Sequence, residues 1–193
     1  MKKLVVFMLV VAMLVFSGSV LAQNTGYLET KVGLDIMGDL EVSNDLVSIG
    51  GFDVETGFTL IGEYKVPTNA QWTLGAGIAY QLDRALDTTG ARDFSFTPIY
   101  GLAQYNMIES PLYLLGHLGY NMFDLDVNNQ PNVNIDHSGG LYYGFGVGVN
   151  FGENNNYVAE GLYSVNNGKV EDNAGNSADV EYSKFTISLG MNF

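Results

Sequence analysis

The sequence contains no cysteine, and that absence excludes several classes of protein at once. It rules out a disulfide framework, thiolate metal sites and a lipid anchor carried on an N-terminal cysteine. After residue 22, no apolar run is long enough for a transmembrane helix, which needs roughly 20 apolar residues. If the remaining chain enters a membrane, it must do so as a closed β-barrel, because only helices and closed barrels satisfy every backbone group in lipid.

Basic residues are also scarce. The chain has 8 Lys and Arg against 21 Asp and Glu, for a formal net charge of −13. This balance argues against nucleic acid as a partner, and against direct adhesion to anionic surfaces without divalent cations.

The N-terminal segment has the organisation of a secretory signal peptide. Lys2 and Lys3 precede an apolar run over residues 4–16, and Val20-Leu21-Ala22 offers a small residue for cleavage. We expect residues 1–22 to be removed and residues 23–193 to form one domain.

The last ten residues alternate between apolar and polar side chains without a break, which predicts a strand with two different faces. The apolar face consists of Phe185, Ile187, Leu189, Met191 and Phe193. The opposite face consists of Lys184, Thr186, Ser188, Gly190 and Asn192.

Similar alternation recurs along the chain and predicts eight strands, at 28–36, 53–65, 72–83, 94–106, 112–121, 142–151, 157–166 and 184–193. The connections alternate between short ones, at 67–71, 108–111 and 152–156, and long acidic ones, near 37–51, 83–93, 122–140 and 167–180. Short turns on the periplasmic rim and long loops on the other are typical of outer-membrane barrels. The sequence therefore predicts an all-β fold, an eight-stranded antiparallel up-and-down transmembrane β-barrel.

Alternation alone does not say which face is outside, because a soluble lipocalin-like barrel also alternates. Here the polar face is rich in Gly, Ala, Ser, Thr and Asn, which suit the crowded interior of an eight-stranded barrel. Aromatic residues fall near predicted strand ends, as in the girdles of membrane barrels: Trp72, Tyr80, Phe94, Tyr120, Phe151, Tyr157 and Phe193. These observations favour lipid outside and polar groups inside.

The alternating segment 185–193, with its terminal aromatic residue, looks like the assembly signal of Gram-negative outer-membrane barrels. Residues 27–193 as a whole resemble the small OmpA/OmpX-type outer-membrane β-barrels, without the peptidoglycan-binding domain that follows the barrel in OmpA. The resemblance implies a place in the cell outer membrane, contact with its lipid and lipopolysaccharide, and recognition by the barrel-assembly machinery.

Charged residues on the predicted inner face form the candidate site. They are Glu29, Lys31, Asp35, Asp53, Glu55, Glu63, Lys65, Asp83, Glu160 and Lys184. Buried charges must be paired. We expect a lumen charge network of Glu29, Lys31, Asp53, Glu55, Glu160 and Lys184, in which Lys31 and Lys184 lie side by side because the first and last strands of a closed barrel are neighbours. Such a network fills the core or, alternatively, provides a gate or narrow ion path.

The two histidines are the residues to weigh for catalysis. His117 lies in a predicted strand and His137 in a predicted loop, beside Asp136 and Ser138. A nucleophilic serine must lie within hydrogen-bond reach of its base, and the sequence identifies no such pair. We expect a lumen hydrogen-bonding role for His117 and no catalytic residue.

No segment predicts a cofactor or a dedicated metal site. The segment 144–148 has glycine at every second position, as a strand lining does, not a nucleotide-binding turn. The segment 124–128 partly mimics a calcium loop, but Asn129 stands where glycine is required. The acidic loops are instead a solvated rim, or a surface on which Ca²⁺ or Mg²⁺ bridges to lipopolysaccharide phosphates.

The function that follows is a structural or surface-interaction role in the outer membrane, with acidic extracellular loops as the contact surface. The alternatives are a lipid-A-modifying enzyme, a narrow ion path and a soluble lipocalin-like carrier. A wide pore is excluded, since eight strands leave an interior filled by side chains.

Overall fold

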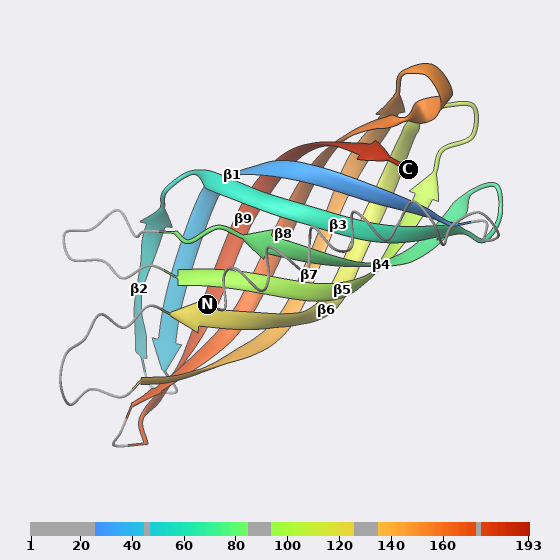
Figure 1. Ribbon diagram of the computed structural model, residues 1–193. Helices are drawn as coiled ribbons and strands as arrows, with labels where there is room; N and C mark the ends of the chain where they lie inside the picture. The colour runs from blue at the N-terminus through green and yellow to red at the C-terminus, as the bar shows by residue number, and fades with distance from the viewer. Residues whose placement is uncertain (1–25, 45–46, 85–93, 126–134, 173–174) are drawn as a thin grey trace.

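The computed structural model describes residues 26–44, 47–84, 94–125, 135–172 and 175–193. Over these residues the chain forms a single β-sheet rolled into a barrel (Figure 1). Its elements, in order, are β1 Tyr27–Asn44, β2 Val47–Val54, β3 Gly57–Pro67, β4 Trp72–Gln81, β5 Phe94–Asn106, β6 Leu112–Leu125, β7 Ile135–Phe151, the short 3-10 segment η2 Glu153–Asn155, β8 Tyr157–Asp172 and β9 Ser177–Asn192.

The barrel has eight strand positions, as predicted. Neighbours pair antiparallel from β3 to β9, and β9 pairs with β1 to close the sheet. β2 and β3 together occupy one strand position, because both pair with β1. β2 pairs with the C-terminal part of β1, and β3 pairs with the N-terminal part of β1. Because β1 pairs with β9, neither of these two strands is a free edge of the sheet.

One rim carries the short connections and the chain end. Thr68 and Asn69 close the first turn on the carbonyl of Trp72, and η2 closes the last. Phe193 exchanges backbone hydrogen bonds with Leu28 at 2.8 and 3.2 Å. The predicted short turns at 67–71, 108–111 and 152–156 all lie here.

In the part of the barrel next to the short turns, the larger apolar side chains point mostly away from the barrel axis. Leu118, Phe145 and Leu189 are 64%, 64% and 62% exposed, whereas Thr186 and Ser188 are buried inside. A soluble barrel would have the opposite arrangement, so the carrier alternative is wrong. Among the described residues, no helix combines the length and apolar character required to cross a membrane.

The predicted long loops are shorter than expected. β1 continues to Asn44, β8 to Asp172, and β9 already begins at Ser177, so most of 37–51 and 167–180 is strand. Likewise, β6 and β7 extend into 122–140. Strands of 16 to 18 residues exceed the roughly 9–11 needed to span a bilayer, so these hairpins project beyond the membrane.

Two irregularities change which side chains face inward. At Met37, with φ of 52°, the pairing of β1 with β9 shifts, so that Asp35 and Gly38 both face inward. Between β2 and β3, Val54 and Gly57 are likewise both buried. A shift of one residue exchanges the two faces of a strand, and Asp53 therefore points outward, contrary to the sequence expectation.

Above these irregularities the interior is apolar. An apolar cluster, here called the plug, closes the extracellular half of the barrel with Leu40, Val54, Phe94, Phe96, Phe123, Val180 and Tyr182. Phe96 stacks on Phe123 at 4.7 Å and on Tyr182 at 5.9 Å between ring centroids. The prediction that Phe94 belongs to the outer aromatic girdle is wrong, since the side chain is 3% exposed and lies in this plug.

Two glycines offer a matched test of the face assignment. A Cβ on Gly148 would lie 2.2 Å from the Tyr113 ring, but a Cβ on Gly62 would meet nothing within 4 Å. Gly148→Val should therefore lower the free energy of unfolding by about 1–3 kcal/mol through overpacking. Gly62→Val should leave it within about 0.5 kcal/mol of the wild-type value. Urea unfolding in lipid vesicles measures both, and equal losses would contradict the assignment.

Candidate functional site: the barrel interior and the extracellular face

The periplasmic half of the interior holds five interacting charges, here called the five-charge cluster: Glu29, Lys31, Glu63, Lys65 and Glu160. The Lys31 ammonium lies 2.8 Å from both Glu29 and Glu63 and also donates to Glu160. Lys65 lies 2.7 Å from Glu29 and 3.2 Å from Glu63. The two lysines thus stand among three carboxylates contributed by β1, β3 and β8.

Neutral donors satisfy the carboxylate oxygens that the lysines leave over. The Tyr100 hydroxyl donates to Glu63 at 2.7 Å, and the Tyr113 hydroxyl donates to Glu160 at 2.7 Å. Lys65 also donates to the side-chain carbonyl of Gln104 at 3.1 Å. A buried charge is tolerated when its remaining hydrogen-bonding capacity is met in this way.

A second group is centred on Asp35 of β1. Lys184 donates to its carboxylate at 2.8 Å, Thr186 donates at 2.7 Å, and Arg84 forms an ion pair with it. The Arg84 guanidinium also donates to the carbonyl of Phe58. One carboxylate therefore faces two cations, the reverse of the imbalance in the five-charge cluster.

The structure brings together Glu29, Lys31 and Glu160 of the expected network, but it places Lys184 elsewhere. Lys31 pairs in register with Gly190, so Lys184 lies six residues further along β9, which is about 20 Å at 3.4 Å per residue. Lys184 accordingly binds Asp35, and the interior contains two groups instead of one network.

Asp53 and Glu55 do not join either group. Asp53 is exposed on β2, and Glu55 is exposed in the break between β2 and β3. The irregularity at Val54 and Gly57 exchanges the inward and outward positions here. Asp83, also expected inside, is exposed after β4. These three placements correct the predicted lumen set.

Arg84 is the interior residue that sequence reasoning missed. It falls in the segment predicted as a loop, yet it is 3% exposed and exchanges two backbone hydrogen bonds with Phe94. Composition offered one signal. Because the domain has so few basic residues, each of them could have been considered as the partner of a buried carboxylate. Glu63 and Lys65 were assigned to the inner face, but their role depends on the pairing of β3 with β1.

His117 lies in the interior, beside the five-charge cluster. Its ring stacks on Tyr100 with centroids 4.3 Å apart and planes at 18°, its Nδ1 lies 3.3 Å from the Tyr142 hydroxyl, and its Nε2 lies 3.7 Å from Glu63. His117 therefore packs against Tyr100 and lies within hydrogen-bond distance of Tyr142 inside the barrel.

His137 lies on β7 rather than in a loop, with its Nε2 3.4 Å from Asp124. Its neighbours Asp136 and Ser138 are exposed. Within the described residues, no serine hydroxyl is hydrogen-bonded to either histidine.

Glu29, Glu63 and Glu160 are close enough together to be considered as ligands of a metal ion. However, the two lysine ammonium groups already lie between these carboxylates, and a divalent cation would have to displace them. The chemistry of this cluster is therefore that of ion pairs. Residues 126–134, which include most of the calcium-like segment, lie outside the described residues.

The outer surface of the projecting hairpins is strongly acidic. The acidic face, as we call it, comprises Asp39 and Glu41 of β1, Asp53 of β2, Asp136 of β7, Glu171 of β8, and Asp179 and Glu181 of β9. Three pairs of like charge stand directly opposite each other across neighbouring strands: Asp39 with Asp53, Glu41 with Glu181, and Asp136 with Glu171. Of the five lysines and arginines in the described residues, Lys169 alone is exposed, and it lies 3.7 Å from Asp179.

The residues of the expected assembly signal lie on the lipid-facing side of β9, next to the closure with β1. Ile187, Leu189, Met191 and Phe193 are exposed, and Phe185 is partly covered.

The imbalance within the two interior groups leads to a prediction. Lys31→Met leaves three carboxylates with one lysine, and breaking a buried pair in this way should cost about 3–5 kcal/mol of unfolding free energy. Lys184→Met should cost less, because Arg84 still pairs with Asp35. Adding Glu160→Gln to Lys31→Met should recover part of the loss. Denaturant unfolding in lipid vesicles measures these differences, and equal losses for the two lysine variants would contradict the division into two groups.

Comparisons with known proteins agree with this architecture. A family described as outer membrane protein beta-barrel domain matches residues 8–193. No match is found among curated proteins.

Solved structures show the same fold at low sequence identity. The attachment invasion locus protein Ail of Yersinia pestis has a TM-score of 0.54 at 18% identity, covering 87% of this chain and 99% of Ail. OprG of Pseudomonas aeruginosa has 0.51 at 15%, covering 88% and 96%. Neisserial surface protein A has 0.52 at 15%, covering 88% and 98%. The family match spans nearly the whole sequence, and the chain belongs to the outer-membrane β-barrel family, as a small barrel of the OmpA/OmpX type located in the outer membrane.

Proposed function

We propose that this barrel is a surface-interaction element of the outer membrane, and that its acidic face binds cationic groups outside the cell. The observation that carries the proposal is the presence of three directly opposed like-charge pairs on strands that project beyond the lipid. They form one continuous surface over β2, β1, β9, β8 and β7.

These pairs are unfavourable for folding. Like charges directly opposite each other on an antiparallel pair destabilise it, and Lys169 is the single described cation available to offset them. Sites where a protein departs from the choices that favour its own folding are expected to serve function. A cationic partner would relieve the repulsion, so binding and stability should rise together.

The interior supports a contact role over transport. The plug fills the extracellular half and the paired charges fill the other half. Apart from a small cavity between the two, side chains fill the described interior, as expected of an eight-stranded barrel.

The nature of the charge distinguishes this barrel from one of its structural relatives. Ail of Yersinia pestis has been crystallised with the heparin analogue sucrose octasulfate, a polyanion. A polyanion would be repelled by the acidic face described here. We therefore assign cations to this chain: basic segments of a partner, or Ca²⁺ and Mg²⁺ bridging carboxylates to lipopolysaccharide phosphates, since both ions prefer oxygen ligands.

The lipid-facing residues Phe185, Ile187, Leu189, Met191 and Phe193 serve, in this proposal, as the signal read by the barrel-assembly machinery. They lie on the strand that closes the barrel against β1. Their exposure supports this role, because an apolar row on the last strand is available before closure.

Charge neutralisation tests the acidic face. The barrel in phosphatidylcholine vesicles should bind a fluorescent oligolysine peptide, and Asp39→Asn, Glu41→Gln and Glu181→Gln combined should weaken that binding about tenfold, or about 1.4 kcal/mol. Binding to the unmodified protein should fall as salt increases, because exposed charges are screened.

The control carries Glu109→Gln and Glu153→Gln, which neutralise two exposed carboxylates on the opposite rim. Equal binding by the two variants, or tighter binding of sucrose octasulfate than of oligolysine, would refute the proposal.

The assembly role is tested by separating insertion from stability. Phe193→Ala should reduce the amount of barrel in the outer membrane of expressing cells, while the purified variant refolded into detergent should unfold like the unmodified protein. Phe145→Ala, at another lipid-exposed aromatic residue, should leave cellular insertion unchanged. A normal amount of inserted Phe193→Ala protein would show that assembly does not depend on this residue.

A further inference from the structure

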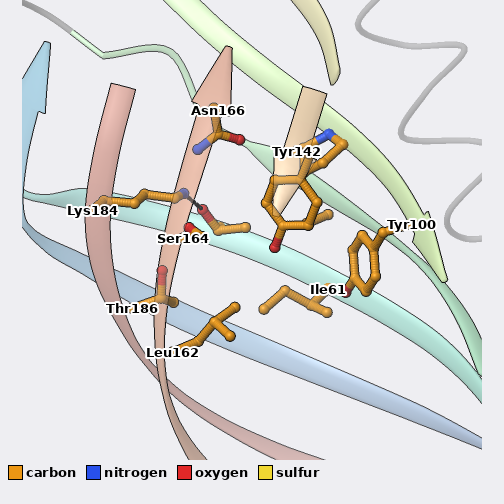
Figure 2. A pocket seen from close by; sticks show the side chains of 11 residues that line it. Ile61, Tyr100, Tyr142, Leu162, Ser164, Asn166, Lys184 and Thr186 are labelled. Carbon is orange, nitrogen blue, oxygen red and sulfur yellow. Dashed lines mark hydrogen bonds between the residues drawn. The ribbon is translucent and has the colours of Figure 1, made fainter. Parts of the chain in front are cut away.

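A small cavity lies inside the barrel between the five-charge cluster and the plug. Figure 2 shows Lys184 and Thr186 on one side of it and Tyr100 and Tyr142 on the other. Its volume of about 20 Å³ has room for one water molecule. Its polar wall includes Ser164 and Asn166, and the side-chain oxygen of Asn166 is buried without a hydrogen-bond partner. A buried acceptor of this kind calls for a small donor such as water.

Both ends of the barrel are closed to this cavity. On β5, Pro98 and Tyr100 line it, Phe96 of the plug lies on its extracellular side, and Gln104 lies toward the periplasm. Along β8, Ser164 lines the cavity and Glu160 of the five-charge cluster follows on the periplasmic side. A molecule that reaches the cavity along the barrel axis must therefore cross either the stacked rings or the ion pairs.

The pairing of β4 with β5 is interrupted beside the cavity. The paired register of β4 with β5 stops at Ile78 and Ile99 and is regained only at the isolated pair of Arg84 and Phe94. Over the same stretch β4 stays paired with β3, and β5 stays paired with β6. Ala79 and Pro98, the residues that follow the last pair on each strand, both line the cavity.

Proline explains where the pairing stops. Phe94 exchanges both its backbone hydrogen bonds with Arg84 of the preceding segment. Because backbone groups alternate in direction along a strand, the backbone nitrogen of Pro98, four residues later, also faces β4. That nitrogen has no hydrogen to donate, and a proline inside a sheet removes one ladder bond. The next two pairs in this register, Ala79 with Pro98 and Tyr80 with Thr97, consequently do not form.

We propose that this interruption is a lateral entrance, through which water and small uncharged molecules reach the cavity from the membrane surface. Near this level Tyr120 is 56% exposed and Tyr80 is partly exposed on the outer surface, and tyrosine is typical of the interface between lipid and water. The entrance supplies a donor to Asn166 without opening either end of the barrel.

The absence of cysteine from the chain makes a single thiol a clean reporter. Ser164→Cys places one inside the cavity with little change in volume. In the folded barrel in phosphatidylcholine vesicles, the uncharged reagent methyl methanethiosulfonate should modify Cys at this position, as followed by mass spectrometry. Ala79→Cys is a second reporter, on the wall of the same cavity, should the first variant fail to fold.

Two further changes, each combined with the reporter, identify the route. Pro98→Val supplies the missing donor at similar volume and should slow modification about tenfold, because added backbone hydrogen bonds favour the closed wall. Phe96→Ala loosens the plug and should leave the rate unchanged. Resistance to unfolding by detergent before heating verifies that each variant is folded.

Three results would overturn the proposal. No modification of either reporter in the folded barrel would show that the cavity is not reached by small molecules. A rate insensitive to Pro98→Val would show that the interrupted wall is not the route. A rate raised severalfold by Phe96→Ala would place the route through the extracellular end.

Discussion

The structure depends on the pairing of charges that are buried inside the barrel. Eight charged side chains lie within the described interior, and four carboxylates face four cations. An uncompensated charge in such surroundings costs several kcal/mol, so neither group tolerates the loss of a partner easily. β1 contributes Glu29, Lys31 and Asp35, whose partners lie on β3, β8 and β9. The same contacts therefore join the first strand to the last and define the register at which the barrel closes.

The demand for cations inside has a consequence for the outside. Four of the five described lysines and arginines are used in the interior, and the projecting hairpins are left with carboxylates facing carboxylates. Because basic residues are scarce and most of them neutralise buried carboxylates, the interior is neutral and the exterior is acidic. A cationic partner would lower the electrostatic energy of the acidic face by relieving the repulsion between its carboxylates.

Alternation of side chains was sufficient to predict eight strands, the short-turn rim and the outward apolar face, because these depend on a period of two within each strand. It failed where the phase changes. Nothing in the sequence around Val54 and Gly57 shows that both face inward, and the assignments of Asp53 and Glu55 were wrong for that reason. The partners of Lys31 depend on the stagger between strands, which alternation does not encode. Arg84 lies beyond the last alternating residue of its strand and carried no periodic signal.

The two irregular points also coincide with an inversion of polarity. On the periplasmic side of Met37, charged groups such as Lys31 face inward and apolar groups such as Leu34 face outward; beyond it, Leu40 faces inward and Glu41 outward. A wall surrounded by lipid requires the first arrangement and a wall surrounded by water requires the second. Strands that continue from lipid into water must exchange their faces, and an insertion that shifts the phase by one residue is the smallest change that achieves this. The plug is then the hydrophobic core of the projecting part, which allows β1, β8 and β9 to remain paired strands where loops were expected.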